Sequence, residues 1–141
     1  MKSFKPILSI LVIGIFAFMA IASGDDDAAR DEVTETEVDF KVTAQEIVSE
    51  YSDNEITAHQ KYENKIVEVT GIISSFGLGA FDDPYMVISP NGIALEAGVH
   101  AYLADDVDAS SFEVGNEITI KGKVGSKTLG DIMVKGCVVV K

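Results

Sequence analysis

The stretch "KYENKIVEVTGIISSFG", residues 61 to 77, decides the fold. Within a few positions it passes from helix-like spacing to an unbroken run of strand-forming residues, and it stops at a glycine. From Lys65 to Ser74 almost every residue is β-branched or small, which is typical of a strand that is half or fully buried. Gly71, in the middle of this run, predicts a bulge or a sharp bend, such as barrels use to coil a long first strand. A sheet is therefore expected to begin directly after a helix.

Two helix-start signals precede this strand. Thr43 can cap a helix while Glu46 reaches back to it, and Ser52 and Glu55 repeat the device. The helical spacing predicts one buried stripe in the first helix, made of Ala44, Ile47, Val48 and Tyr51. A second short helix is expected to end near residue 62, with an inner side made of Ile56, His59 and Tyr62. Residues 43–62 should therefore form a bent helical layer that covers the sheet.

Four more strands are expected after the first one. Turn residues and alternation place them at residues 84–89, 99–103, 117–124 and 131–140, with turns at 90–92 and 125–130 and a polar crossover at 104–112. The inward side chains of the third and fourth strands should be Val99, Ala101, Leu103, Ile118, Ile120 and Val124, with Gly122 among them. The pattern predicts a mainly β fold, a five-stranded OB-type barrel of antiparallel strands preceded by the bent N-terminal helical layer. A five-stranded meander or a half-sandwich is the alternative that the same pattern leaves open.

The first 24 residues form a separate unit. Lys2 and Lys5 precede an uncharged apolar run, and Ala20-Ile21-Ala22 matches the A-x-A pattern of a signal-peptide cleavage site. The uncharged run is also close to the roughly 20 residues that span a bilayer. Residues 1–24 are therefore expected to be a signal peptide or, if uncleaved, a signal anchor that is the only membrane contact. Either alternative places the remainder outside the cytoplasm: periplasmic, secreted, or anchored to the outer side of the cytoplasmic membrane.

The remainder of the chain is acidic. Residues 25–40 contain eight acidic residues and one arginine, hence a net charge of −7, and few large apolar side chains. This composition predicts an acidic disordered linker, with residues 41–141 as the OB-fold domain. The formal net charge of the whole chain is −12. Such a charge disfavours phosphate backbones and anionic lipid surfaces as partners, and it also keeps a protein soluble.

Cys137 is the only cysteine. No intramolecular disulfide can form, and one cysteine with two histidines is too few for a zinc cluster. Strict alternation from Ile132 and Val134 would turn Cys137 outward together with Lys135. We expect it instead as a buried, unpaired thiol of the core, which requires an irregularity at Gly136.

The segment "VTAQEIVSEYSDNEITAHQKYENKIVEVTGIISSFG" resembles the tRNA_anti-like family of small exported or membrane-anchored bacterial OB-fold proteins. In that family a helix that ends in a K-Y-x-x-K element, here residues 61–65, runs into a V-x-G strand, here residues 69–71. "VGNEITIKGKV" (114–124) and "DIMVKGCVVV" (131–140) fit the last two strands, so the resemblance covers about residues 42 to 140. It implies an OB fold and brings no catalytic residues. Many relatives carry a cysteine where this chain has Ala101, so the disulfide that such a cysteine could form with strand five is out of reach here.

Residues that carry chemistry are sparse. Neither Cys137 nor any serine stands in a recognisable motif with a histidine and an acid, and residues 125–128 lack the spacing of a phosphate loop. Residues 105–108 could coordinate calcium but lack the glycine and the distal glutamate of an EF-hand. His59 is expected to pack against the helix layer rather than to act as a ligand. The sequence therefore predicts no enzyme, no metal site and no cofactor.

An OB barrel usually binds its ligand on the outer face of its second and third strands. The candidate ligand-binding residues there are Tyr85, His100 and Tyr102. His100 and Tyr102 face outward on the third strand, and the register of the second strand decides whether Tyr85 or Met86 lies beside them. Acidic loops at residues 82–83 and 105–106 border this face. A basic stripe of Lys121, Lys123 and Lys127 could serve nucleic acid, but a solvated strand face explains it as well.

These observations favour a non-catalytic extracytoplasmic binding module for an unidentified ligand or protein segment, neutral or cationic in charge. A structural or interaction accessory of an envelope complex is the alternative. A nucleic-acid-binding OB domain is a third possibility, which the acidic charge disfavours because phosphate neutralisation supplies most of such affinity.

Overall fold

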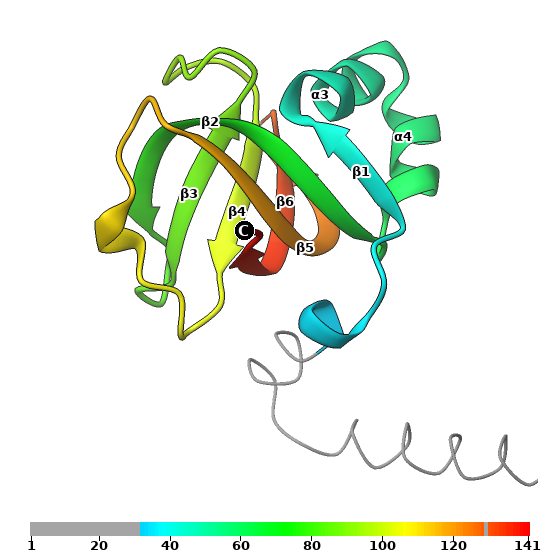
Figure 1. Cartoon of the computed structure of the whole chain (residues 1–141). Coiled ribbons are helices and arrows are strands. Elements are labelled where there is room, and N and C mark those ends of the chain that lie inside the picture. Colours follow the sequence, from blue (N-terminus) through cyan, green and yellow to red (C-terminus); the bar gives the residue numbers. More distant parts are fainter. Residues whose placement is uncertain (1–31, 129) are drawn as a thin grey trace, which may run out of the picture.

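The computed structural model describes residues 32–128 and 130–141 (Figure 1). The expected signal segment and residues 25–31 of the expected linker lie outside the described residues. No helix within the described ranges has the length and hydropathy needed to cross a membrane. The elements in chain order are β1 (Phe40–Thr43), α3 (Ala44–Asp53), α4 (Glu55–Tyr62), β2 (Ile66–Leu78), β3 (Pro84–Ser89), β4 (Val99–Leu103), the 3-10 turn η1 (Ala109–Ser111), β5 (Glu117–Thr128) and β6 (Asp131–Val139).

Five strands close into a barrel in the order β2-β3-β4-β6-β5, and β5 pairs back to β2. This closure confirms the OB-type barrel and excludes the meander and the half-sandwich. Four of the five strand contacts are antiparallel, whereas β4 and β6 run parallel. The expectation of antiparallel strands throughout is wrong at this contact. The chain crosses through η1 and β5 before β6 returns to the side of β4, so the two strands enter the sheet in the same direction.

The segment before the helices is ordered on the barrel in residues 32–40. β1 is a sixth strand outside the ring, and it pairs in parallel with Val67–Thr70 of β2. Asp39 accepts a hydrogen bond from the Ile66 amide at 2.9 Å, and Val33 is fully buried in a helical turn at residues 32–35. The disordered linker expected up to residue 40 is therefore not what the structure shows from residue 32 onward. Two of its acidic side chains, Glu32 and Asp39, are held by Lys123 and Ile66, a stabilisation that composition alone does not reveal.

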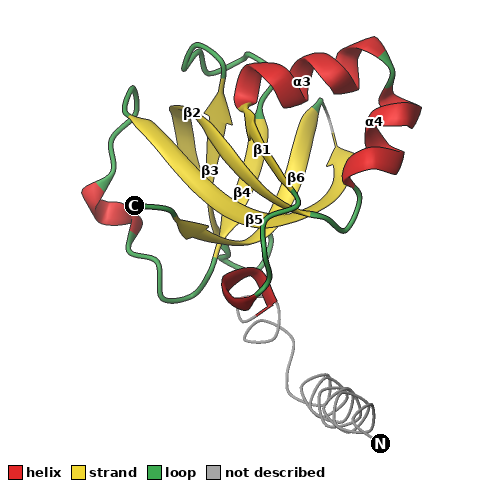
Figure 2. Cartoon of the chain, turned by 45° about the vertical axis from the view of Figure 1, so that its right-hand side comes forward, coloured by secondary structure: helices red, strands yellow, loops and turns green. Residues whose placement is uncertain are grey.

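The helical layer lies at one end of the barrel (Figure 2). The capping box at the start of α3 is confirmed, because the Glu46 amide donates to Thr43 Oγ1 at 3.1 Å and the Thr43 amide to Glu46 Oε1 at 3.4 Å. The second box is wrong: Asn54 caps α4 by accepting from the Thr57 amide at 3.1 Å. The side chains that the helices bury are Ala44, Ile47 and Tyr51 of α3 and Ala58 and Tyr62 of α4.

Two side chains of α4 differ from the expected inner side. Ile56 is 73% exposed, because it lies two residues, roughly 200° of helical rotation, from the buried Ala58. His59 lies near the surface, where its Nε2 is 2.7 Å from Glu63 Oε2. Tyr62 is buried as expected.

The bend in β2 separates its two pairings. Residues 66–72 pair with β5 and residues 72–78 pair with β3, and the register shifts between Ile73 and Ser75. The irregularity therefore falls just after Gly71 rather than on it. A Cβ added at Gly71 would lie 2.6 Å from Ile88 Cγ2 and 2.8 Å from Ala44 Cβ. Gly71 is thus required by the close approach of its neighbours on β3 and α3.

The expected irregularity in the last strand is confirmed. Ala101 pairs with Val134, but Leu103 pairs with Cys137, so β6 contains one extra residue at this point. Gly136 takes the left-handed conformation that this bulge needs, with a φ of 64°. Cys137 is fully buried in the core as a free thiol. The turn expected at residues 125–130 begins later, since β5 continues to Thr128.

Candidate ligand-binding groove

The three candidate residues come together on the outer face of β3 and β4. Tyr85 and Tyr102 are register partners, and His100 lies two residues before Tyr102 on the same face of β4. The ring centroids are 4.0 Å apart for Tyr85 and His100, 5.1 Å for His100 and Tyr102, and 5.8 Å for the two tyrosines. All three side chains are half-buried. We call them the aromatic cluster.

The rings of the aromatic cluster pack mainly on one another. Tyr85 lies over Gly77 of β2, where an added Cβ would be 2.5 Å from the ring carbon that carries the hydroxyl. His100 Nδ1 is 3.8 Å from Asp131 Oδ2, and its Nε2 is buried with no hydrogen-bond partner among the described residues. Burial lowers the pKa of the His100 imidazole, and the Asp131 carboxylate opposes this shift. A cluster whose faces are covered in this way offers little stacking surface to a planar ligand.

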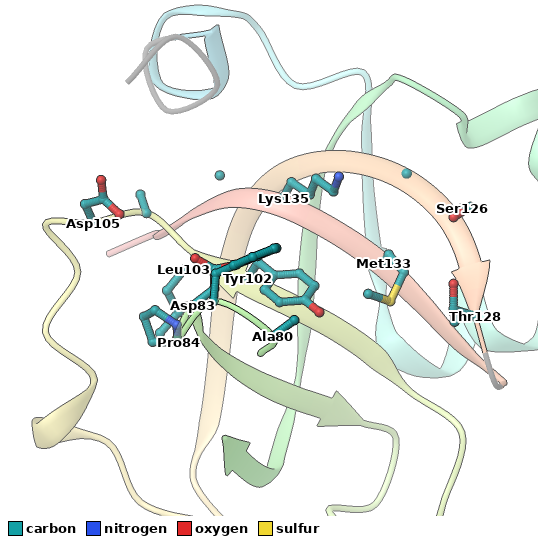
Figure 3. A pocket seen from close by; sticks show the side chains of 14 residues that line it. Ala80, Asp83, Pro84, Tyr102, Leu103, Asp105, Ser126, Thr128, Met133 and Lys135 are labelled. Atoms are coloured by element: carbon teal, nitrogen blue, oxygen red, sulfur yellow. The ribbon is translucent and has the colours of Figure 1, made fainter. Parts of the chain in front are cut away.

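A groove with a volume of about 490 Å³ opens beside Tyr102 (Figure 3). It lies between the loop after β2, the end of β4, and the hairpin that joins β5 to β6. This is the place where OB barrels bind their ligands, because the corresponding loops flank the outer face of the sheet there. Of the three candidate residues, only Tyr102 lines the groove.

The groove combines apolar and charged groups. Its apolar lining includes Phe81, Pro84, Tyr102, Leu103 and Met133. Its charged side chains are Asp83, Asp105 and Lys135, all of them exposed. The two acidic loops expected at this border thus each contribute one carboxylate, while Asp82 and Asp106 do not line the groove.

Phe81, Met133 and Lys135 are among the groove residues that sequence reasoning missed. Phe81 is 87% exposed in a short loop, where alternation carries no information. Met133 and Lys135 are outward residues of β6 that alternation could have indicated. Alternation does not place them beside the candidate face, because β6 joins that face only through its parallel pairing with β4.

The basic stripe on β5 is engaged within the molecule. Lys123 Nζ is 2.9 Å from Glu32 Oε1, and Lys127 Nζ is 2.8 Å from Glu55 Oε1. Lys121 Nζ lies 3.5 Å from the Thr34 carbonyl oxygen. These lysines therefore serve the attachment of the helical turn at residues 32–35 and of α4 to the barrel.

The closed barrel and the position of its groove define an OB-fold domain. The tRNA_anti-like family model matches residues 1–138, and the chain belongs to this family. One solved structure of the same kind is a Klebsiella pneumoniae protein described as a "putative nucleic acid-binding lipoprotein". It is 18% identical, with a TM-score of 0.54, and the match covers 84% of this chain and 100% of that one. A similarity at this identity shows the fold alone. Comparison with curated proteins gave no match.

Proposed function

We propose that the protein is a non-catalytic, extracytoplasmic OB-fold module that binds a neutral or cationic ligand, or a segment of another protein, in the groove beside Tyr102. The observation that carries this proposal is the groove itself, which has an aromatic wall and carboxylates on its border. Its volume of about 490 Å³ falls within the roughly 300–1,000 Å³ that is typical of ligand pockets. The non-catalytic role rests on the lack of any recognisable nucleophile–base motif in the sequence.

The N-terminal sequence and one comparison support a location outside the cytoplasm. Lys2, Lys5 and the apolar run after them have the order of a secretory signal, and the Klebsiella pneumoniae neighbour is described as a lipoprotein. Protease added to intact spheroplasts should digest the domain. Full protection of the domain, with digestion after lysis, would contradict this location.

Nucleic-acid binding is the second candidate, because the description of the Klebsiella pneumoniae neighbour includes it. The arrangement of charge and rings argues against it in this chain. Lys123 and Lys127 are paired with glutamates, and the aromatic cluster is packed on itself. Phosphate neutralisation and base stacking are the two main sources of affinity for single strands.

A titration of the purified protein with labelled single-stranded DNA and RNA at physiological salt separates these candidates. Even non-specific binders have dissociation constants of about 10⁻⁴ to 10⁻⁶ M under such conditions. We expect no binding in this range. Micromolar binding that weakens in Tyr102→Ala, but not in Gln60→Ala on the exposed side of α4, would establish the nucleic-acid function instead.

A further inference from the structure

β4 and β6, which both border the groove, are paired on both sides: β4 with β3 and β6, and β6 with β4 and β5. An extended peptide therefore cannot pair its main chain with either of these two strands, which is the usual mode at an open edge. At these strands an occupant must be selected by side chains of the groove and by its loops.

Negative charge is concentrated on the border of the groove. Asp83 and Asp105 form no ion pair and no side-chain hydrogen bond with any other described residue. Lys135 also lacks an ion pair within the described ranges, and in Figure 3 its amine points away from Asp105. Two uncompensated carboxylates beside a low-dielectric wall favour a cation, and the net charge of −12 attracts one from a distance.

Exposed apolar side chains extend this surface beyond the groove. Phe81 is 87% exposed on the border, and Leu78, the register partner of the lining residue Pro84, is 65% exposed at the end of β2. Phe81 and Tyr102 offer rings in the same groove as the carboxylates, and Leu78 adds aliphatic surface beside Pro84. Lysine and arginine side chains match such a surface, because each has an apolar stem and a cationic head that also interacts with aromatic faces.

We propose that the groove binds an extended protein segment through a lysine or arginine side chain. The stem of this side chain packs on Tyr102 and Phe81, and its charge is bound by Asp83 and Asp105. Flanking apolar residues of the segment contact Leu78, which favours a protein segment over a free small amine. This inference rests on the proposed function, since it names the occupant of the same groove.

The test uses three synthetic heptapeptides that differ only in their central residue, which is arginine, the neutral isostere citrulline, or glutamate, flanked by leucines and serines. Each is titrated into the ¹⁵N-labelled full-length protein, and binding is followed by amide shifts of groove residues such as Phe81, Tyr102 and Asp105. N-acetylarginine amide serves as the free small cation. We expect the arginine peptide to bind about fivefold or more tightly than the citrulline peptide, the glutamate peptide to bind least, and the free cation to bind more weakly than the arginine peptide.

Four variants assign this preference to the groove. Asp83→Asn and Asp105→Asn should each weaken the arginine peptide about two- to fivefold, the range of an exposed ion pair. Lys135→Gln should strengthen it, because that change removes a repulsive charge. Asp53→Asn, at the exposed end of α3, removes the same charge away from the groove and should leave the affinity within twofold. All four side chains are exposed, so the variants keep the fold.

The outcomes separate this inference from the proposed function. Equal affinities for the arginine and citrulline peptides, with shifts at the groove, would overturn the inference that the groove recognises a basic side chain. The proposed function, a binding groove beside Tyr102, would remain. If N-acetylarginine amide bound as tightly as the arginine peptide, the inference that the occupant is a protein segment would be overturned. No shift at the groove with any probe up to millimolar concentration would overturn both proposals.

Discussion

Replacement of Gly122 by alanine is expected to destabilise the barrel. Gly122 is an inward position of β5, and an added Cβ would lie 2.5 Å from Val134 Cγ1, 2.7 Å from Cys137 Sγ and 3.1 Å from the Lys135 carbonyl oxygen. Val134 and Cys137 are fully buried, and the third atom belongs to the backbone, so none of them can move at low cost. Overpacking of this kind costs about 1–3 kcal/mol in the free energy of unfolding.

Gly125 provides a matched control on the same strand. A Cβ added there would meet only the Met133 carbonyl oxygen at 3.6 Å and Met133 Cβ at 3.9 Å, which are ordinary van der Waals contacts. Gly125→Ala should therefore be neutral or should stabilise by about 0.4–1 kcal/mol, because alanine restricts the unfolded chain. The same substitution three residues apart is thus expected to have opposite effects.

Urea denaturation followed by circular dichroism measures both variants, with an unchanged m-value as the sign that only stability has changed. The midpoint of thermal unfolding should fall by roughly 4 °C for each kcal/mol lost. Cys137→Ala removes one of the three obstructing atoms, so it should cost less in the Gly122→Ala background than alone, with a coupling of about 0.5–3 kcal/mol. Equal stability of the two glycine variants, or strict additivity with Cys137→Ala, would refute the packing argument.

The remaining predictions concern a thiol, a phenol and a helix cap. Cys137 should react with a thiol reagent only at the rate of unfolding, because burial removes access and raises the pKa of the thiol; fast labelling of the native protein would contradict this. Burial, reinforced by the hydrogen bond from Tyr62 Oη to Glu50, raises the pKa of the Tyr62 phenol to about 12. Between pH 10 and 12 the folded state therefore keeps a proton that the unfolded state loses, so stability should fall as the pH rises through this window. Tyr62→Phe should reduce that slope in urea titrations across the window, and an unchanged slope would count against this assignment. Asn54→Ala should cost about 1 kcal/mol of stability in urea denaturation, whereas Ser52→Ala should cost little, because Asn54 and not Ser52 caps α4. A larger loss of stability in Ser52→Ala than in Asn54→Ala would favour the capping pair of Ser52 and Glu55 expected from the sequence.

The barrel could be predicted because inward apolar and outward polar residues alternate along its strands with few interruptions. The inward side chains of β4 and β5 have the period of two that one buried face requires, and the structure buries them all. The order of residues 32–40 could not be predicted in this way. The sequence around Asp39 and Glu32 predicts solvated acidic side chains. Asp39 instead accepts from the Ile66 amide, 27 residues away, and Glu32 pairs with Lys123, 91 residues away. Contacts of that separation leave no local pattern.

The candidate site was predictable only where it follows the pleat of the sheet. Alternation places His100 and Tyr102 on one face, but whether Tyr85 or Met86 lies beside them depends on the register of β3. Alternation also does not show that the rings cover one another. The groove depends on the loop after β2, on the hairpin between β5 and β6, and on the parallel pairing of β4 with β6, none of which alternation reveals.

The bulge at Gly136 links the core to the groove. It turns Cys137 inward, and the residues just before it, Met133 and Lys135, lie along the groove with Gly136 itself. The left-handed Gly136 thus places Cys137 in the core and keeps Met133 and Lys135 along the groove. The sequence shows the need for this irregularity through the position of a single cysteine, but which side chains the bulge presents to a ligand follows only from the parallel pairing of β4 and β6.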